Sequence, residues 1–72
     1  MDVGAMIKDY LEENGISQAF ISRETKINPV KLNMSLNGNR KLGLEEYVLI
    51  CGALKVDANT FLKPSINDSA AR

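Results

Sequence analysis

The sequence has no histidine, only one cysteine, Cys51, and no hydrophobic run long enough to span a bilayer. A single cysteine cannot form a disulfide within the chain, and the spacing of zinc sites built from cysteine and histidine is absent. The sequence also lacks a phosphate-binding glycine loop and a cluster of carboxylates in an apolar setting. We therefore predict no catalytic residue, no metal, no cofactor, no membrane contact and no enzyme activity.

The size and composition point to one small folded domain. The chain has 72 residues, 44% of them hydrophobic, which is enough for a single hydrophobic core but leaves little stability to spare. Its first residues, Met1-Asp-Val-Gly, lack the basic and apolar regions of a secretory signal. We therefore expect a cytoplasmic protein.

The charges are balanced in number but uneven in position. The chain carries nine basic and nine acidic residues, and a net charge of zero by itself argues against a nucleic-acid partner. Residues 18–44, however, contain one acidic residue, Glu24, and five basic ones, which are Arg23, Lys26, Lys31, Arg40 and Lys41. A neutral protein with a basic middle segment can still present one positive face.

Helical periodicity and capping signals predict an all-α domain. The five expected helices cover about residues 3–13, 18 to 24 or 25, 29–36, 44–54 and 58–62. The fourth should carry an apolar group of residues on or near one face, namely Leu44, Tyr47, Val48, Cys51 and Leu54. We expect the domain to occupy residues 1–63, with a mobile tail or linker over residues 64–72.

The segment from Ser17 to Leu36 carries the functional signal. It contains two short helices joined by about three residues, with Ser17 and Asn28 as N-caps and Pro29 at the first helical position. Such a short turn forces the two helices to cross steeply, so apolar residues must fill the space between them. The outer face of the second helix is then free, and a helix of this size fits the major groove of DNA.

The side chains on and around that outer face suit duplex DNA. Asn33 can form a bidentate pair with adenine, and Val30 and Met34 can contact thymine methyl groups. The residues predicted to read bases are Asn28, Val30, Asn33 and Met34. The residues predicted to bind backbone phosphates are Lys31, Arg40 and Lys41, together with Gln18 at the N-terminus of the first of the two helices.

The same residues resemble a known family. The segments are Ile16-Ser17-Gln18, Ile21-Ser22, Lys26-Ile27-Asn28, Leu32 and Leu36-Asn37-Gly38, followed by Leu44, Leu54-Lys55-Val56 and Phe61-Leu62. Together they closely resemble the compact five-helix DNA-binding domain of phage lambda repressor and Cro-type proteins, which contains a helix-turn-helix. The resemblance covers roughly residues 5–62 and implies that Gln18 and Asn37 contact phosphates. It also implies a DNA contact for Arg40 and base contacts for Pro29, Val30 and Met34.

Four positions depart from the pattern of that family. Lys26 stands where glycine is usual, so its backbone must adopt a left-handed turn or another geometry. Ser22 replaces a common alanine, which is a small change. Pro29 and Val30 replace polar side chains that commonly read bases, so specificity would depend more on Asn33, Lys31, methyl contacts and DNA shape.

The resulting hypothesis is a small transcriptional regulator, a phage or prophage-type repressor that binds a palindromic operator as a homodimer. Dimerisation is expected because one short helix reads only a few base pairs. The predicted dimer interface consists of Val56, Ala58, Phe61 and Leu62. The alternatives are an antitoxin, a restriction-modification controller, or a protein-interaction module that has lost DNA binding. A protein partner such as a toxin or an antirepressor is left open.

Overall fold

Four α-helices and the segments between them form residues 2–62, the part of the chain that the computed structural model describes. The helices are α1 (Val3–Glu13), α2 (Gln18–Thr25), α3 (Pro29–Leu36) and α4 (Leu44–Leu54), and no strand occurs between residues 2 and 62. Their bounds match the first four helices that the sequence predicts. The domain is therefore all-α, as expected. The predicted tail over residues 64–72 lies outside the described residues.

The helices begin where side chains can accept hydrogen bonds from their first free N–H groups. The Ser17 hydroxyl accepts from the N–H of Phe20 at 3.0 Å, and the Asn28 carboxamide oxygen accepts from two N–H groups of α3 at 2.8 and 3.2 Å. Helix α4 has Gly43 at its N-cap, which offers no side chain. Instead Glu46, in the first turn of α4, accepts a bond from the Gly43 N–H at 3.1 Å, which is half of a capping box.

Each helix ends at or next to a residue with left-handed backbone. After α1 and α3 this residue is a glycine, Gly15 (φ 64°) or Gly38 (φ 82°), as the sequence signals predict. After α2 and α4 it is a lysine, Lys26 (φ 67°) or Lys55 (φ 59°). The left-handed conformation costs a residue with a Cβ about 1–2 kcal/mol, so packing elsewhere must hold these two lysines in place.

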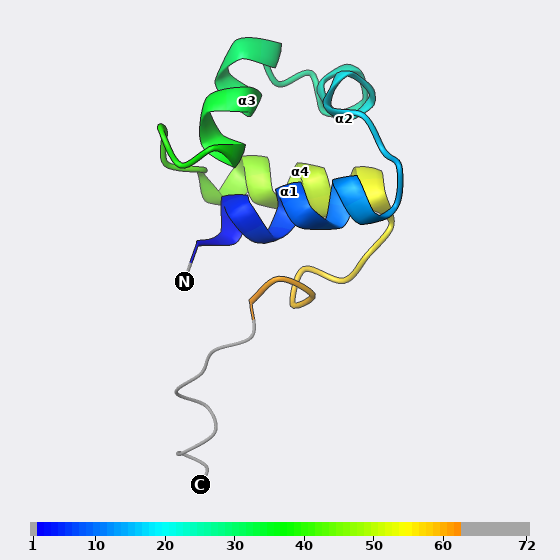
Figure 1. Cartoon of the computed structure of the whole chain (residues 1–72). Coiled ribbons are helices and arrows are strands. Elements are labelled where there is room, and N and C mark those ends of the chain that lie inside the picture. Colours follow the sequence, from blue (N-terminus) through cyan, green and yellow to red (C-terminus); the bar gives the residue numbers. More distant parts are fainter. Residues whose placement is uncertain (1, 63–72) are drawn as a thin grey trace, which may run out of the picture.

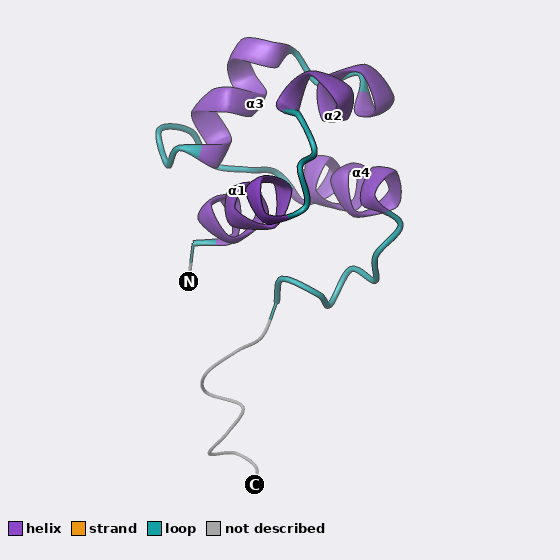
Figure 2. Ribbon diagram, turned by 45° about the vertical axis from the view of Figure 1, so that its right-hand side comes forward, coloured by secondary structure: helices purple, strands orange, loops and turns teal. Residues whose placement is uncertain are grey.

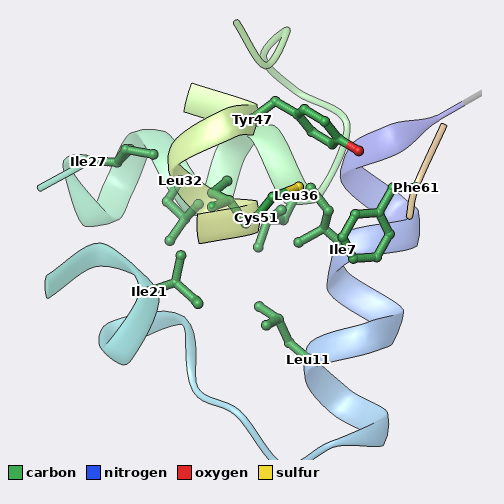
Figure 3. Close-up of a cluster of buried hydrophobic side chains, with 10 residues drawn as sticks. Ile7, Leu11, Ile21, Ile27, Leu32, Leu36, Tyr47, Cys51 and Phe61 are labelled. Atoms are coloured by element: carbon green, nitrogen blue, oxygen red, sulfur yellow. The ribbon is translucent and has the colours of Figure 1, made fainter. Parts of the chain in front are cut away.

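One hydrophobic core joins all four helices. In both views of the ribbon, α2 and α3 lie on one side of the domain and α1 and α4 on the other (Figures 1 and 2). The buried hydrophobic residues come from every helix and from the segment after α4 (Figure 3); they are Ile7, Leu11, Ile21, Ile27, Leu32, Leu36, Tyr47, Ile50, Cys51 and Phe61. Ile21, Ile27 and Leu32 are thus among the apolar residues that fill the space between the two short helices, and Cys51 is a packing residue.

The predicted face of α4 is wrong in part. Tyr47 and Cys51 are buried as expected, and Ile50 joins them, but Leu44 and Val48 point to solvent with 77% and 52% of their surface exposed. The helix is apolar on nearly every side, so its periodicity does not identify which side meets the core. The packing of α4 against α2 determines which side of α4 is buried.

The predicted fifth helix does not form. Residues 58–61 make consecutive turns, with bonds from the Thr60 N–H to the Asp57 carbonyl (2.9 Å) and from the Leu62 N–H to the Asn59 carbonyl (3.1 Å). Five residues before Pro64 can form too few helical hydrogen bonds to offset the unfavourable free energy of helix nucleation. Tertiary contacts hold the segment, because the Tyr47 hydroxyl donates to the carbonyl of Ala58. The Phe61 ring also packs edge-on against Tyr10, with 5.5 Å between the ring centroids.

Candidate nucleic-acid interface

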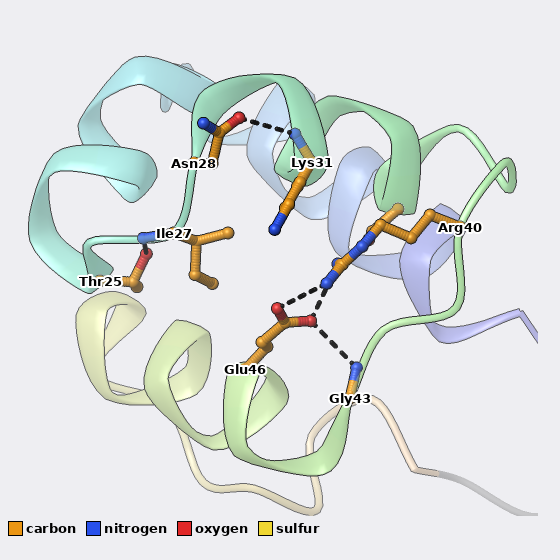
Figure 4. Close-up of polar contacts among 8 residues, drawn as sticks. Thr25, Ile27, Asn28, Lys31, Arg40, Gly43 and Glu46 are labelled. Atoms are coloured by element: carbon orange, nitrogen blue, oxygen red, sulfur yellow. Dashed lines mark hydrogen bonds and ion pairs between the residues drawn. The ribbon is translucent and has the colours of Figure 1, made fainter.

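The turn between α2 and α3 is held by hydroxyl groups that the sequence places inside it. The Ser22 hydroxyl donates to the carbonyl of Ile27 at 2.5 Å. The Thr25 hydroxyl donates to the Ile21 carbonyl at 2.7 Å and accepts from the N–H of Ile27 at 3.2 Å (Figure 4). These buried bonds satisfy backbone groups that the short turn would otherwise leave unpaired, and they hold Lys26 in its left-handed conformation.

The outer face of α3 is exposed rather than packed into the core. Its side chains are all exposed, which matches the prediction for a reading face; they are Asn28, Val30, Lys31, Asn33 and Met34. Val30 is 66% exposed and Met34 is 39% exposed, so both are available for contacts to apolar groups. The α3 outer face, as we call this set, contains no carboxylate and would not repel a phosphate backbone.

Two of the predicted DNA-binding residues are bonded to each other. The Asn33 side-chain N–H₂ donates to the Gln18 carboxamide oxygen at 3.2 Å and so joins the first turn of α2 to the middle of α3. This bond orients both amides. It leaves the oxygen of Asn33 free to accept and the N–H₂ of Gln18 free to donate. The Gln18 donor can therefore meet a phosphate beside the N-terminus of α2, while Asn33 faces outward.

Asn37 is held by a residue that sequence reasoning missed. The Lys8 ammonium of α1 donates to the Asn37 carboxamide oxygen at 2.7 Å, and the Asn37 N–H₂ donates to the Asn33 carbonyl at 2.9 Å. Lys8 thus adds a positive charge at the end of α3. Because Lys8 and Asn37 are 29 positions apart in the chain, no local pattern indicates that they meet.

Arg40 is engaged in an ion pair. Its guanidinium donates two bonds to the Glu46 carboxylate, at 3.0 and 2.9 Å, and one to the Ser35 hydroxyl at 2.9 Å. The hydrogen bond with Glu46 raises the pKa of Arg40, and the same bond, assisted by the Gly43 N–H, lowers the pKa of Glu46. Arg40 therefore braces the loop between α3 and α4, and its charge is largely compensated before any phosphate arrives.

The remaining predicted phosphate contacts, Lys31 and Lys41, are both exposed. Lys31 extends from α3 towards the Arg40–Glu46 pair (Figure 4), and its positive charge contributes to the lowered pKa of Glu46. Lys41 lies in the loop before α4. Lys31 is thus a cation of the α3 outer face itself, whereas Lys8 lies at the end of α3 and Lys41 in the loop that follows it.

No family model, curated protein or solved structure matches this chain. The resemblance to lambda repressor and Cro-type proteins therefore remains an interpretation of the residues quoted for it. Within residues 2–62, no helix is long and apolar enough to cross a membrane, and no group of three or more potential ligand side chains could hold a metal ion.

The four predicted dimer residues differ in exposure. Phe61 is only 4% exposed and belongs to the core, so it is not available to a partner. Val56 is half-buried against the same core, whereas Ala58 and Leu62 are exposed. Leu62 borders a shallow hollow that Leu44 also lines, so the exposed apolar surface continues onto α4.

Proposed function

We propose that this protein binds duplex DNA sequence-specifically through a helix-turn-helix formed by α2 and α3, and that it acts as a small transcriptional regulator. The observation that carries the proposal is the α3 outer face. It is exposed, lacks carboxylates, and combines two amides, two apolar side chains and a lysine. Such a helix presents groups that match base edges in the major groove.

The surroundings of α3 supply the complementary phosphate contacts. Gln18 stands at the first position of α2 with a free amide donor. Positive charge is added by Lys31 on α3, by Lys8 at the end of α3 and by Lys41 in the following loop. These groups would fix the register of the protein on the duplex, while Asn33, Val30 and Met34 would discriminate bases. A repressor that binds a palindromic operator as a homodimer fits this division of roles, and cytoplasmic action follows from a DNA target.

Selection from random-sequence duplexes at two salt concentrations tests the proposal. We expect an enriched two-fold motif and an affinity that falls as salt rises, because phosphate contacts release counterions. Absence of binding even at low salt would exclude the function.

Two substitutions then separate the roles of the residues. Lys31→Ala should weaken binding to all sequences and reduce the slope of log affinity against log salt by about 1. Asn33→Ala should instead relax the preference at one base pair, worth about 1–3 kcal/mol of discrimination. An unchanged preference in Asn33→Ala would show that α3 does not read DNA as assigned.

A protein-interaction module is the second candidate, and one observation favours it. Val30 and Met34 together make the α3 outer face partly apolar in a chain with no net charge. The salt dependence distinguishes the two functions, since an apolar protein interface responds little to salt.

A further inference from the structure

The side of α4 that faces away from the core is apolar and exposed. Five exposed residues form this α4 outer face: Leu44, Glu45, Val48, Leu49 and Gly52. Single exposed aliphatic residues are common on proteins, but here three lie within two turns of one helix. The exposed Leu62 borders the same surface through the hollow next to Leu44. A patch of this kind is typical of a surface that another molecule covers.

Gly52 is the residue that the isolated domain does not explain. It lies inside α4, where glycine weakens a helix relative to alanine. A Cβ added at this position would meet nothing within 4 Å, so no contact in the described part of the chain requires glycine here. Its missing side chain instead leaves the α4 backbone uncovered one turn beyond Val48, where another helix could approach closely.

The charges around the patch indicate which molecule fits it. Glu45 and Lys55 are both exposed, and they lie five residues before and five residues after Ile50. Val48 and Gly52 lie two residues before and two after the same position. Two copies of α4 in antiparallel orientation would therefore oppose each glutamate to a lysine and each valine to a glycine. A parallel pair would bring the two glutamates together, which is unfavourable.

We propose that the α4 outer face binds the same face of a second copy of this chain, with the two helices antiparallel about a two-fold axis near Ile50. Val48 of each copy packs over Gly52 of the other, and Glu45 faces Lys55, so that every contact occurs twice. The next exposed charges at either end, Lys41 and Asp57, are also of opposite sign. The proposal deepens the proposed function by naming the partner surface of the homodimer, and it is measured without DNA.

Sedimentation equilibrium of the full chain, from about 10 μM to 1 mM, tests the association. We expect a reversible dimer that weakens when salt is added, because part of the complementarity is electrostatic. Gly52→Gln should prevent the close approach of the second helix and raise the dimer dissociation constant at least about tenfold. The same change should increase the melting temperature of the monomer, because glutamine is a better helix former. A glycine with a purely local role would change the melting temperature alone, and that result would overturn the proposal.

A charge exchange tests the orientation. Glu45→Lys should weaken the dimer about tenfold at low salt, and the double variant Glu45→Lys/Lys55→Glu should restore it to within about threefold. Glu13→Lys makes the same charge change at an exposed position of α1 and should leave the dimer unaffected. Failure of the double variant to restore association would contradict the antiparallel pairing.

The remaining outcomes are also decisive. A chain that is monomeric at every concentration overturns the proposal. If the chain dimerises only after residues 63–72 are deleted, the patch is covered by that segment and not by a second copy. A monomer that still binds DNA would leave the proposed function standing, whereas a dimer that binds no DNA would exclude only that function.

Discussion

The outer faces of α3 and α4 are both exposed on short helices of the same small domain, yet their side chains are held differently. On α3, Asn33 is bonded to Gln18, and Asn37 at the end of the helix is bonded to Lys8. The α4 outer face presents aliphatic side chains beside uncovered helix backbone at Gly52. A face whose amides are oriented in advance suits directional contacts with bases and phosphates. An apolar patch beside uncovered backbone suits close packing against a complementary shape.

A matched pair of substitutions, one on each face, gives the strongest test of this difference between the two faces. Val30 and Val48 are exposed valines on the two faces, and either can be changed to glutamate without burying a charge. Val30→Glu places a carboxylate against the DNA backbone, and we expect at least an about 100-fold loss of duplex affinity with unchanged self-association. Fluorescence anisotropy with a labelled duplex and sedimentation equilibrium measure the two effects.

Val48→Glu is the reciprocal control. We expect it to abolish self-association while leaving the affinity for a duplex with a single half-site unchanged. If both variants impair DNA binding to a single half-site equally, the two faces do not have separate functions.

A double-mutant cycle sharpens the description of the α3 face. Gln18→Ala and Asn33→Ala each remove one partner of the same hydrogen bond, so their effects on DNA affinity should not add. We expect a coupling free energy of about 1 kcal/mol, equivalent to roughly a fivefold difference from additivity. Lys41→Ala paired with Gln18→Ala serves as the control, because these residues do not contact each other by hydrogen bond. Strict additivity for Gln18 and Asn33 would mean that they act independently.

Because the backbone of Lys26 is left-handed, we expect glycine at this position to increase the stability of the domain. Lys26→Gly should relieve the backbone strain at φ 67° and increase the free energy of unfolding by about 1 kcal/mol. Lys26→Ala removes the same charge but keeps the Cβ, so it should give no such gain. Urea unfolding of the three proteins measures the difference, and equal stability of the glycine and alanine variants would show that the turn is unstrained.

The smallest expected effect concerns the Arg40–Glu46 pair between the two faces. Because the pKa of Glu46 is lowered in the folded protein, its contribution to stability is present above the pKa of an unfolded glutamate. That contribution is lost as the pH falls through the lowered value. Glu46→Gln should therefore reduce stability by about 0.5 kcal/mol near neutral pH and by nothing in strong acid. Urea unfolding at both pH values checks this, and a difference that persists in acid would contradict it.

The first four helices and the α2–α3 turn were predictable because their signals are local. Ser17 and Asn28 cap the helices from within three residues, Pro29 suits the first turn of α3, and Gly15 and Gly38 adopt the left-handed backbone that ends a helix. The exposed set on α3 follows from the same periodicity once Leu32 and Leu36 are taken as core residues.

Other features depend on parts of the chain that are distant in sequence. The bond between Lys8 and Asn37 exists only because α1 and α3 pack together. Likewise, Arg40 lies on the predicted binding side, but the position of α4 brings Glu46 to it and compensates its charge. The predicted dimer residue Phe61 enters the core because Tyr10 and Tyr47 offer edge-on contacts to its ring.

The sequence by itself determined the all-α class, the ends of four helices and the residues on the outside of α3, because caps, glycines and periodicity act within a few residues. Tertiary structure alone decided which side of α4 meets the core, whether residues 58–62 stay in turns, and which cations remain free near α3. These outcomes depend on competition among contacts that are distant in sequence. That competition also leaves Leu44 and Val48 exposed on a helix that is apolar nearly all round.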